Sequence, residues 1–312
     1  MDLSIIVISY NTKGHLQECM NSLRNSSDKL EKEIIVVDNG SSDGSSDMVK
    51  NIFPYVKLIE NKKNLGFARA NNQAFHIAQG RYLLLVNSDC FVFPDTIQKT
   101  CEFINISKDC GILGCRLVYP DGRYQISTRY FPTLWRLFAL RTGLSGKAGF
   151  IKGIDSDAYL HECPEKVDWI HGCYFLIRRE VLEAIKSFDE AFFMYTEDME
   201  FCFRAKKKGW NTMFYPGARA THIMQASTRN GRKSLDSVQE VKKLKIFGEF
   251  IYFKKHYGMI YLSADLLLFF LANMIQIVKK LLLWRRNISI LEKVEEMGLV
   301  FGGCFGLSKG RD

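Results

Sequence analysis

The segment RYLLLVNSDC, residues 81–90, constrains the fold of this chain more than any other. Its apolar run stops abruptly at Asn87-Ser88-Asp89, which is typical of a strand buried on both faces of a parallel sheet. Open α/β sheets bind ligands beyond the carboxyl ends of their strands, where Asp89 would lie. A carboxylate there suits Mg²⁺ or Mn²⁺ held together with a substrate phosphate, although an aspartate after a strand is more often a turn former.

The first 120 residues alternate strand-like apolar runs with amphipathic stretches. This order predicts an α/β fold, with a single, mainly parallel sheet flanked by helices. Residues 111–127 predict a further strand and a hairpin that turns at Asp121-Gly122. We expect strands at 3–9, 33–39, 56–61 and 81–89, with helices beginning near Thr12, Gly66 and Pro94.

Beyond residue 130 the pattern changes twice. Residues 130–165 lose periodicity and predict an irregular insertion or loop. A central strand is expected within 167–180, and a helix from Glu197 that ends at Gly209. The sequence therefore predicts two domains, one at 1–232 and a basic helical C-terminal region at 233–312.

The net charge of +9 is concentrated in the second half, where residues 201–287 hold seventeen Lys and Arg against four Asp and Glu. Such a region suits an anionic partner. No nucleic-acid-binding module is recognisable, so a lipid or a phosphate-bearing acceptor is favoured over nucleic acid. The nine cysteines lack the spacing of metal ligands and predict reduced thiols. The first apolar strand has no charged leader before it, which predicts a cytoplasmic protein.

Polar clusters close the first two strands. Ser9-Tyr10-Asn11 follows one and Asp38-Asn39-Gly40-Ser41 follows the other, so both should lie at the same edge of the sheet as Asp89. Asp38 could accept a hydrogen bond from a base, and Tyr10 could pack on its ring. The alternative is that the second cluster is only an Asx-turn loop with no role in binding.

Two further segments carry candidate chemistry. Residues 64–72 contain amides, small residues and an arginine at the start of a helix. Free backbone N–H groups at such a helix start would suit a phosphate. The segment is not a P-loop, because the Gly-Lys-Ser/Thr ending is missing. The second segment, residues 197–200, places three carboxylates at a helix start, after an apolar and aromatic stretch that would raise their pKa values. The alternative for these carboxylates is that they only place favourable negative charge at the N-terminus of a helix. For His222, which stands alone in the sequence, a structural role is more common than a catalytic or metal-binding one.

In this order, the clusters resemble the family-2 glycosyltransferases with the GT-A fold, and most closely their bacterial rhamnosyltransferase-like branch. The resemblance covers residues 3–225. It rests on SIIVISYN, IIVVDNGSSDGS, NLGFARANN, LLLVNSD, WIHGCYFLIRRE, FDEAFFMYTEDMEFCFR and His222.

The resemblance implies a role for each of these clusters. The catalytic base would be Asp198, flanked by Glu197, and the metal ligands would be Asp89 and His222. The sugar and acceptor pocket would involve Trp169, His171, Gly172, Glu200 and Arg204. The nucleotide would be held by Ser9, Tyr10, Asn11, Asp38, Asn64, Gly66, Arg69, Asn71 and Ser88. Two departures are Ser88, where the branch more often has proline, and Glu200, where aspartate is commoner.

The implied function is an inverting transferase dependent on Mn²⁺ or Mg²⁺. It would move a sugar from a nucleotide-diphosphate donor, dTDP-rhamnose or a UDP-hexose, to a hydroxyl of a cell-surface polysaccharide or lipid-linked saccharide. Two alternatives are a sugar-phosphate nucleotidyltransferase, which would need a basic glycine-rich loop after the first strand, and a catalytically inactive, membrane-associated nucleotide-sugar-binding protein.

Residues 258–286 form the longest apolar stretch. It is interrupted by polar residues that fall within a helical sector of ~120° at about 100° per residue. We expect the helix to lie in the interface of the inner face of an anionic membrane, as a peripheral contact. Packing on the protein or across a homodimer, and a true membrane span, are the alternatives. The polar sector consists of Asp265, Asn273, Gln276, Lys279 and Lys280.

Overall fold

The computed structural model describes residues 1–26, 29–144, 154–223, 235–283 and 289–306. It divides into two compact units, each described here by itself. The sheet unit comprises Met1–Tyr130 and Ser156–Ser237, and the helical unit comprises Phe131–Asp155 and Val238–Asp312.

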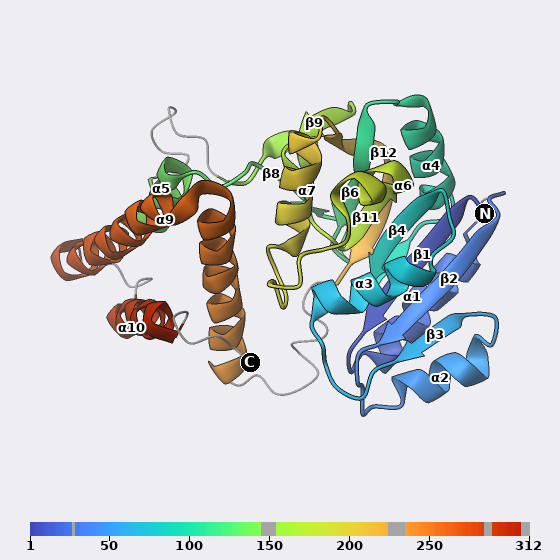
Figure 1. The fold of residues 1–312 in the computed structure, drawn as a ribbon, viewed down its shortest axis with the longest axis horizontal. Coiled ribbons are helices and arrows are strands. Elements are labelled where there is room, and N and C mark those ends of the chain that lie inside the picture. The colour runs from blue at the N-terminus through green and yellow to red at the C-terminus, as the bar shows by residue number, and fades with distance from the viewer. Residues whose placement is uncertain (27–28, 145–153, 224–234, 284–288, 307–312) are drawn as a thin grey trace. The chain divides into compact units, whose positions relative to one another are not determined.

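The sheet unit is built on one mixed sheet that is parallel over its first four strands (Figure 1). The strand order is β3-β2-β1-β4-β11-β6-β12-β5, with β7 beside β6 and β9 beside β12. The predicted α/β architecture, a mainly parallel sheet with flanking helices, is confirmed. The strands are β1 (Leu3–Ser9), β2 (Lys32–Asp38), β3 (Lys57–Glu60), β4 (Tyr82–Asn87), β5 (Cys90–Val92), β6 (Cys110–Val118), β7 (Tyr124–Gln125), β9 (Glu165–Val167), β11 (Tyr174–Arg178) and β12 (Asn211–His222), and a separate pair joins β8 (Thr128–Arg129) to β10 (Trp169–Ile170).

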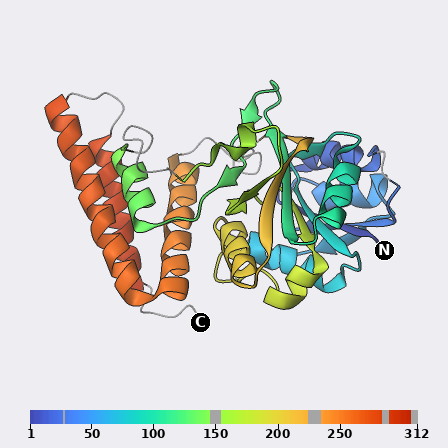
Figure 2. The ribbon, with the colours of Figure 1, turned by 90° about the horizontal axis from the view of Figure 1, so that it is seen from above.

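Helices cover both faces of this sheet (Figure 2). Alternate residues of β1, β2 and β4 form one core cluster with α1, α2 and α4, because side chains in a strand point alternately to the two faces. On the other face, the ring of Phe188 contacts Phe75 of α3, Phe175 of β11 and Phe201 of α7. The helices of the unit are α1 (Lys13–Arg24), α2 (Ser45–Ile52), α3 (Phe67–Ile77), α4 (Thr96–Ile106), the short 3-10 helix η1 (Asp157–Leu160), α6 (Arg179–Ile185) and α7 (Glu197–Lys207).

The register of the parallel strands brings the predicted polar clusters to one edge of the sheet. Ser9 lies opposite Asp38, and Ile8 lies opposite Asn87, so β1, β2 and β4 end side by side. The expectation that these strand ends share an edge is therefore confirmed by the pairing.

The prediction that residues 130–165 are irregular is wrong in part. Residues 134–142 form α5 (Leu134–Thr142), and β9 and η1 also fall in the interval. The helix signals were present in the sequence. The hydroxyl of Thr133 accepts a hydrogen bond from the N–H of Arg136, and Gly143 closes the helix in the left-handed conformation. This segment belongs to the helical unit, so that unit is discontinuous in sequence, and the proposed boundary at residue 232 stays a prediction.

The helical unit contains α5, α9 (Leu235–Leu283) and α10 (Ile290–Gly306). Gly258, with φ of +84°, interrupts α9 with non-helical backbone. Arg141 of α5 forms ion pairs with Glu249 and Asp265, which lie on either side of this break. The side chain of Asp265 is fully buried, so the ion pair fixes α5 against both halves of α9.

Candidate active site

The end of β1 is tied to the end of β4 through hydroxyl groups. The hydroxyls of Ser9 and Thr12 lie 3.0 Å apart, and the hydroxyl of Thr12 donates a 2.9 Å hydrogen bond to that of Ser88. Thr12 directly precedes α1, as predicted, but its side chain makes this bridge instead of capping the helix. Thr12 was missed as a site residue because only the register of β1 and β4 reveals its partner.

Asp38 presents a carboxylate oxygen that nothing in the described part of the chain satisfies. Its side chain is buried, Oδ2 accepts a 3.0 Å hydrogen bond from the N–H of Ser41, and Oδ1 has no partner there. Buried polar atoms are normally hydrogen-bonded, so an orphan acceptor at a ligand edge suits a donor from a ligand. Beside it, Asn11 adopts a left-handed φ of +53° and Tyr10 is 36% exposed. The roles of Asp38 and Tyr10 in holding a base stay predictions.

Asn39 holds the loop before α3, and sequence reasoning had not singled it out. Its Nδ2 donates to Oδ1 of Asn64 at 2.9 Å, and its Oδ1 accepts from the N–H of Leu65 at 3.0 Å. The N–H of Gly66 donates to Asn64, and the N–H of Phe67 donates to the carbonyl of Phe193. The prediction of free N–H groups at this helix start is therefore wrong for these three amides, which the protein itself satisfies.

The remaining predicted residues of α3 differ in exposure. Asn71 is fully buried, its Nδ2 donates to the carbonyl of Phe67, and its Oδ1 has no partner in the described residues. Arg69 is 57% exposed and pairs with Glu190 through a 2.8 Å hydrogen bond. Their predicted positions near ribose and phosphate stay predictions.

Asp89 and His222 come together at the same edge. His222 ends β12 and lies opposite Cys90, and its Nε2 is 3.4 Å from Oδ1 of Asp89. Both side chains are buried, and Nδ1 of His222 lies 2.8 Å from Oε1 of Gln125. Burial opposes the charged imidazole, but Cys173 and Asp89 outweigh it and raise the pKa of His222 to about 10. Within the described residues, no group of three or more His, Cys, Asp or Glu side chains forms a metal cluster.

Asp198 lies at the start of α7 with both carboxylate oxygens held by the backbone. Oδ2 accepts a 3.0 Å hydrogen bond from the N–H of Gly172, and Oδ1 accepts one of 2.8 Å from the N–H of Met199. Burial raises the pKa of Asp198 above its ordinary value, and these two N–H groups and Arg129 partly oppose the shift. A half-buried carboxylate with a raised pKa is the form that general bases take.

Glu197 differs from its neighbour. It is buried, and its Oε2 has no hydrogen-bond partner within the described chain. Burial, followed by the charge of Asp198, raises the pKa of Glu197 well above its usual range. Both causes favour the neutral form of the Glu197 carboxyl over its charged form.

The loop before α7 is strained. Tyr195 and Thr196 have φ values of +68° and +78°, a conformation that costs about 1–3 kcal/mol each for residues other than glycine. Burial raises the pKa of Tyr195, and the charges of Glu197 and Asp89 raise it further. Tyr195 thus lies within electrostatic reach of both the catalytic and the metal candidates, which sequence spacing alone did not reveal.

Arg129 is another residue that the sequence did not single out. Its Nε donates a 3.0 Å hydrogen bond to Nε2 of His171, and its guanidinium lies 5.7 Å from the ring centre of Trp169. Pairing of β8 with β10 places Arg129 opposite Trp169. Three predicted pocket residues, Trp169, His171 and Gly172, therefore gather around Asp198 together with this unpredicted cation.

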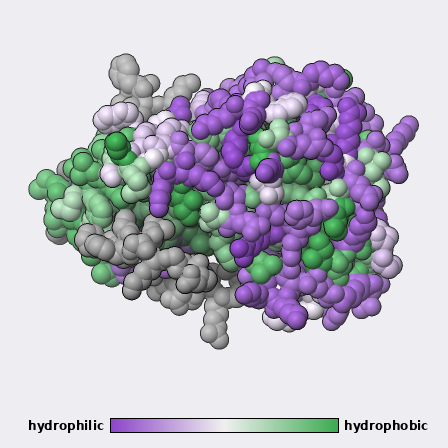
Figure 3. All heavy atoms as spheres, in the orientation of Figure 1, coloured by the Kyte–Doolittle hydropathy of each residue, from purple (hydrophilic) through white to green (hydrophobic). Residues whose placement is uncertain are grey.

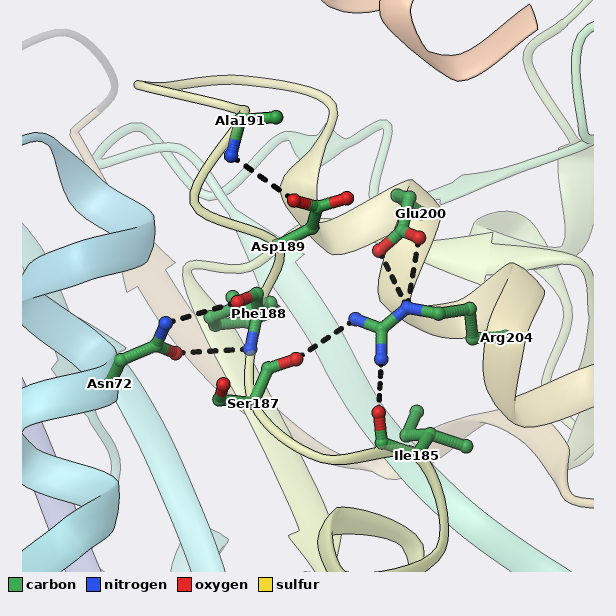
Figure 4. A network of polar contacts seen from close by, with 8 residues as sticks. All are labelled: Asn72, Ile185, Ser187, Phe188, Asp189, Ala191, Glu200 and Arg204. Carbon is green, nitrogen blue, oxygen red and sulfur yellow. Dashed lines mark hydrogen bonds and ion pairs between the residues drawn. The ribbon is translucent and has the colours of Figure 1, made fainter. Parts of the chain in front are cut away.

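Glu200 and Arg204 have a different position (Figure 4). Nε of Arg204 lies 2.8 Å from both carboxylate oxygens of the fully buried Glu200, while its other nitrogens donate to the carbonyls of Ile185 and Ser187. Asn72 of α3 holds the same loop through the N–H and carbonyl of Phe188. Through these contacts, Glu200 and Arg204 position the loop that leads to Tyr195. The contacts do not support the predicted role of the two residues in the acceptor pocket.

Comparisons with known proteins agree with this geometry. The profile of the family Glycosyl transferase family 2 matches residues 4–186. An N-acetylglucosaminyl-diphospho-decaprenol L-rhamnosyltransferase of Mycobacterium tuberculosis is 27% identical over 245 residues, which are 72% of this chain and 77% of the relative. A low-salt glycan biosynthesis hexosyltransferase of Haloferax volcanii is 26% identical over 218 residues, which are 67% and 63% of the two chains.

Solved structures show the same fold. A mannosyltransferase from Pyrobaculum calidifontis, in complex with GDP-Man and Mn²⁺, superposes with a TM-score of 0.56 at 15% identity, over 98% of this chain and 80% of that one. The S. aureus protein TarS, in complex with UDP, gives a TM-score of 0.53 at 19% identity, over 94% and 77%. The family profile, which matches more than half of the chain, and the GT-A architecture lead to one conclusion: the chain belongs to glycosyl transferase family 2 and is similar to its rhamnosyltransferases.

Proposed function

We propose that this chain is an inverting, metal-dependent transferase that moves a sugar from a nucleotide-diphosphate donor to a hydroxyl of a saccharide acceptor. The observation that carries the proposal is the carboxylate of Asp198, oriented by the N–H of Gly172 and lying at the site where Arg129, His171 and Trp169 gather. This carboxylate has the fixed orientation and raised pKa that proton abstraction requires.

The donor nucleoside would bind at the ends of β1 and β2. The unpartnered Oδ1 of Asp38 would accept a hydrogen bond from the base, and Tyr10 would pack against its ring. The side chain of Asn71 has an unpartnered buried oxygen on α3, which suits a hydroxyl of the ribose. A donor that carries a pyrimidine base, dTDP-rhamnose or a UDP-hexose, fits the acceptor atom of Asp38 because such a base has a ring N–H.

The residues at the strand edge fit a divalent ion. Asp89 would supply a carboxylate oxygen, and His222 would supply its Nε2 once the ion displaces the proton there, a donor set that Mn²⁺ accepts. Gln125 lies at hydrogen-bond distance from the second ring nitrogen of His222. Two protein ligands leave the other coordination positions for diphosphate oxygens and water. A bound ion there would neutralise the charge that develops on the departing nucleoside diphosphate.

Asp198 would take the proton from the acceptor hydroxyl as its oxygen attacks the anomeric carbon. The bond from carbon to the diphosphate breaks as the new bond forms, so one displacement inverts the anomeric configuration. Burial raises the pKa of Asp198, and Arg129 partly opposes that shift and so favours the charged form of the base. The strained backbone at Tyr195 and Thr196 would hold the start of α7 in this geometry.

The acceptor would be a lipid-linked saccharide of a cell-surface polymer, used at the cytoplasmic face of the membrane. The name of the mycobacterial relative, which includes a diphospho-decaprenol acceptor, supports this class. The family profile gives no support to a nucleotidyltransferase, and the presence of both Asp89 and Asp198 argues against an inactive binding protein.

The test is a donor screen that measures release of nucleoside diphosphate from a panel of dTDP-, UDP- and GDP-sugars, with Mn²⁺ or Mg²⁺ and a synthetic prenyl-diphosphate saccharide as acceptor. We expect one donor to turn over, with metal dependence and inverted product stereochemistry. Asp198→Asn should lower kcat by about 10²–10⁴-fold while leaving donor binding intact.

Asp47→Asn is the matched control, because Asp47 is exposed on α2 and the substitution removes the same charge. Equal activity of Asp198→Asn and Asp47→Asn would overturn the assignment of the base. Failure of every nucleotide to bind in the presence of metal would overturn the transferase proposal as a whole.

A further inference from the structure

The second half of α9 carries its apolar side chains outward. Between Ile260 and Leu282, eight positions are exposed and seven of them hold large apolar side chains, Ser263 being the exception. Ile260 is 90% exposed and Leu267 70%. At about 100° per residue the seven fall within a sector of roughly 100°. We define the apolar seam as Ile260, Leu267, Leu271, Met274, Val278, Leu281 and Leu282, and Figure 3 shows hydrophobic residues gathered over the helical unit.

The polar residues of the same helix face inward. Asp265 is fully buried against Arg141, Nε2 of Gln276 donates to the carbonyl of Arg141, and Nζ of Lys279 donates to the carbonyl of Thr142, each at 2.8 Å. At Asp265, Gln276 and Lys279, the predicted polar sector of this helix therefore faces α5. Polar contacts hold the unit together from within, and its apolar side chains are left outside.

An exposed apolar stripe of this length marks an interaction surface. By length and composition α9 is a candidate membrane span, and only 28% of its most apolar window is buried within the protein. A span would surround the helix with lipid, whereas α5 and the Arg141 ion pairs occupy its other side. The geometry therefore favours a surface that meets its partner from one side.

Charge identifies the partner. The helical unit, residues 131–155 and 238–312, contains sixteen Lys and Arg against eight Asp and Glu, a net charge of +8 out of the +9 of the whole chain. Two copies that met seam to seam would bring two such charges together, which opposes association. An anionic lipid surface is attracted to the same charge, and it accepts apolar side chains at the boundary between head groups and acyl chains.

We propose that the helical unit docks on an anionic bilayer through the apolar seam, with α9 lying in the plane of the interface beyond Gly258. The inference does not depend on the transferase activity, because the seam, the internal polar contacts and the charge all belong to the helical unit. The test therefore uses the full chain without any sugar substrate, so that its failure is separate from failure of the proposed reaction.

The experiment measures co-sedimentation of the full chain with vesicles of phosphatidylcholine alone, or with about one third phosphatidylglycerol, at low and high salt. We expect binding to the anionic vesicles, weakened about tenfold or more by salt or by omission of the anionic lipid. Leu267→Asp/Leu271→Asp should abolish most of this binding, because two charges would have to enter the apolar boundary.

Ile106→Asp is the matched control, because Ile106 is 74% exposed on α4 of the sheet unit and loses the same kind of side chain. Unchanged circular dichroism and an unchanged thermal unfolding midpoint would confirm that the seam variant is folded. Wild-type protein that stays in the supernatant, a seam variant that binds as well as wild type, or a dimer in solution that the seam variant dissociates would each overturn the proposal.

Discussion

The backbone N–H of Gly172 donates a 3.0 Å hydrogen bond to Oδ2 of Asp198, and no side chain stands between them. A Cβ atom added at Gly172 would lie 3.6 Å from Cβ of Asp198 and 3.8 Å from Cε1 of Phe67. These are ordinary contacts, so the fold does not require glycine at this position.

Gly172→Ala should separate function from stability. Because the methyl group makes only ordinary contacts, we expect the free energy of unfolding to change by less than about 1 kcal/mol. The same methyl group occupies space next to the carboxylate, so kcat/KM for the acceptor should fall about tenfold or more. Steady-state kinetics with varied acceptor, together with urea unfolding, measure the two effects.

Gly14→Ala is the control, because a Cβ there meets nothing within 4 Å and the residue lies in α1. It should leave activity unchanged and stabilise the chain by about 0.5–1 kcal/mol, since alanine is the better helix former. Wild-type acceptor kinetics for Gly172→Ala would show that the acceptor approaches Asp198 from another direction.

The pH dependence of transfer should report on Asp198. Burial raises its pKa, so the base is protonated and inactive at pH values where an ordinary aspartate, with a pKa of about 3.9, is charged. The acid limb of the kcat/KM profile should therefore lie above that value, with activity rising as the pH rises through it. Arg129→Gln removes a charge that lowers this pKa, and it should move the limb to still higher pH.

Glu197→Gln provides the contrast. Burial, followed by the charge of Asp198, raises the pKa of Glu197 and favours its neutral form, which glutamine resembles. We expect the limb to stay in place and activity to remain within a few-fold of wild type. A loss as large as that of Asp198→Asn would instead assign Glu197 a charged role in the reaction.

Arg204→Ala should destabilise the sheet unit. The substitution leaves Glu200 fully buried without its ion-pair partner and releases the carbonyls of Ile185 and Ser187. Breaking a buried pair in this way costs about 3–5 kcal/mol, which urea unfolding would detect. Lys208→Ala, at an exposed position just after α7, should change stability by no more than about 0.5 kcal/mol.

A double substitution tests whether the loss comes from the unpaired carboxylate. Glu200→Gln/Arg204→Met removes both charges, and it should recover part of the stability that Arg204→Ala loses. Equal destabilisation by the double and single substitutions would mean that the loop contacts to Ile185 and Ser187 carry the effect instead.

The edge of the sheet could be predicted from the sequence because parallel strands carry a strong signal. The apolar runs that end at Ser9, Asp38 and Asn87 define strands whose carboxyl ends must share an edge once the order is βαβ. The predicted positions of Asp89, Asp198 and Gly172 depended in addition on the family resemblance, because the spacing of lone carboxylates does not show which of them meet.

Residues on short strands were missed for a physical reason. Gln125 and Arg129 lie on β7 and β8, which have two residues each, too few for an apolar periodicity to mark them. The partner of β8 is also distant in sequence, since it pairs with β10. The helical unit shows a related failure. Periodicity identified the two sides of α9 but not which one faces inward, because that depends on Arg141 in α5, more than a hundred residues earlier.

Removal of metal ligands should change the metal dependence of nucleotide binding. In calorimetry with UDP, Mn²⁺ should tighten binding to the wild-type chain, and Asp89→Asn should remove that gain while leaving binding in EDTA unchanged. Gln125→Leu leaves the ligands in place but deprives Nδ1 of His222 of its partner, and it should weaken Mn²⁺ binding about 10–100-fold. Asp47→Asn, again the control, should bind as wild type does, and Mn²⁺ tightening that survives in Asp89→Asn would place the ion elsewhere.

The stability of the helical unit should fall as the pH rises towards about 8 and then level off. Burial raises the pKa of Glu249 to about 8, with a contribution from Asp265, while Arg141 opposes the shift. The folded unit therefore binds a proton that the unfolded chain, with a glutamate pKa of about 4.3, has released. This contribution to stability is fully present below the unfolded pKa and is lost as the pH rises through the folded pKa, by about 1.4 kcal/mol per pH unit.

Thermal unfolding followed by circular dichroism between pH 5 and 9 measures this slope, and Glu249→Gln isolates it from other titrating groups. Because the amide cannot ionise, the stability of the variant should depend less on pH across this range, and the difference from wild type should shrink at low pH. Parallel profiles for the two proteins would show instead that Arg141 keeps Glu249 charged in the folded unit, as one member of a permanently ionised cluster with Asp265.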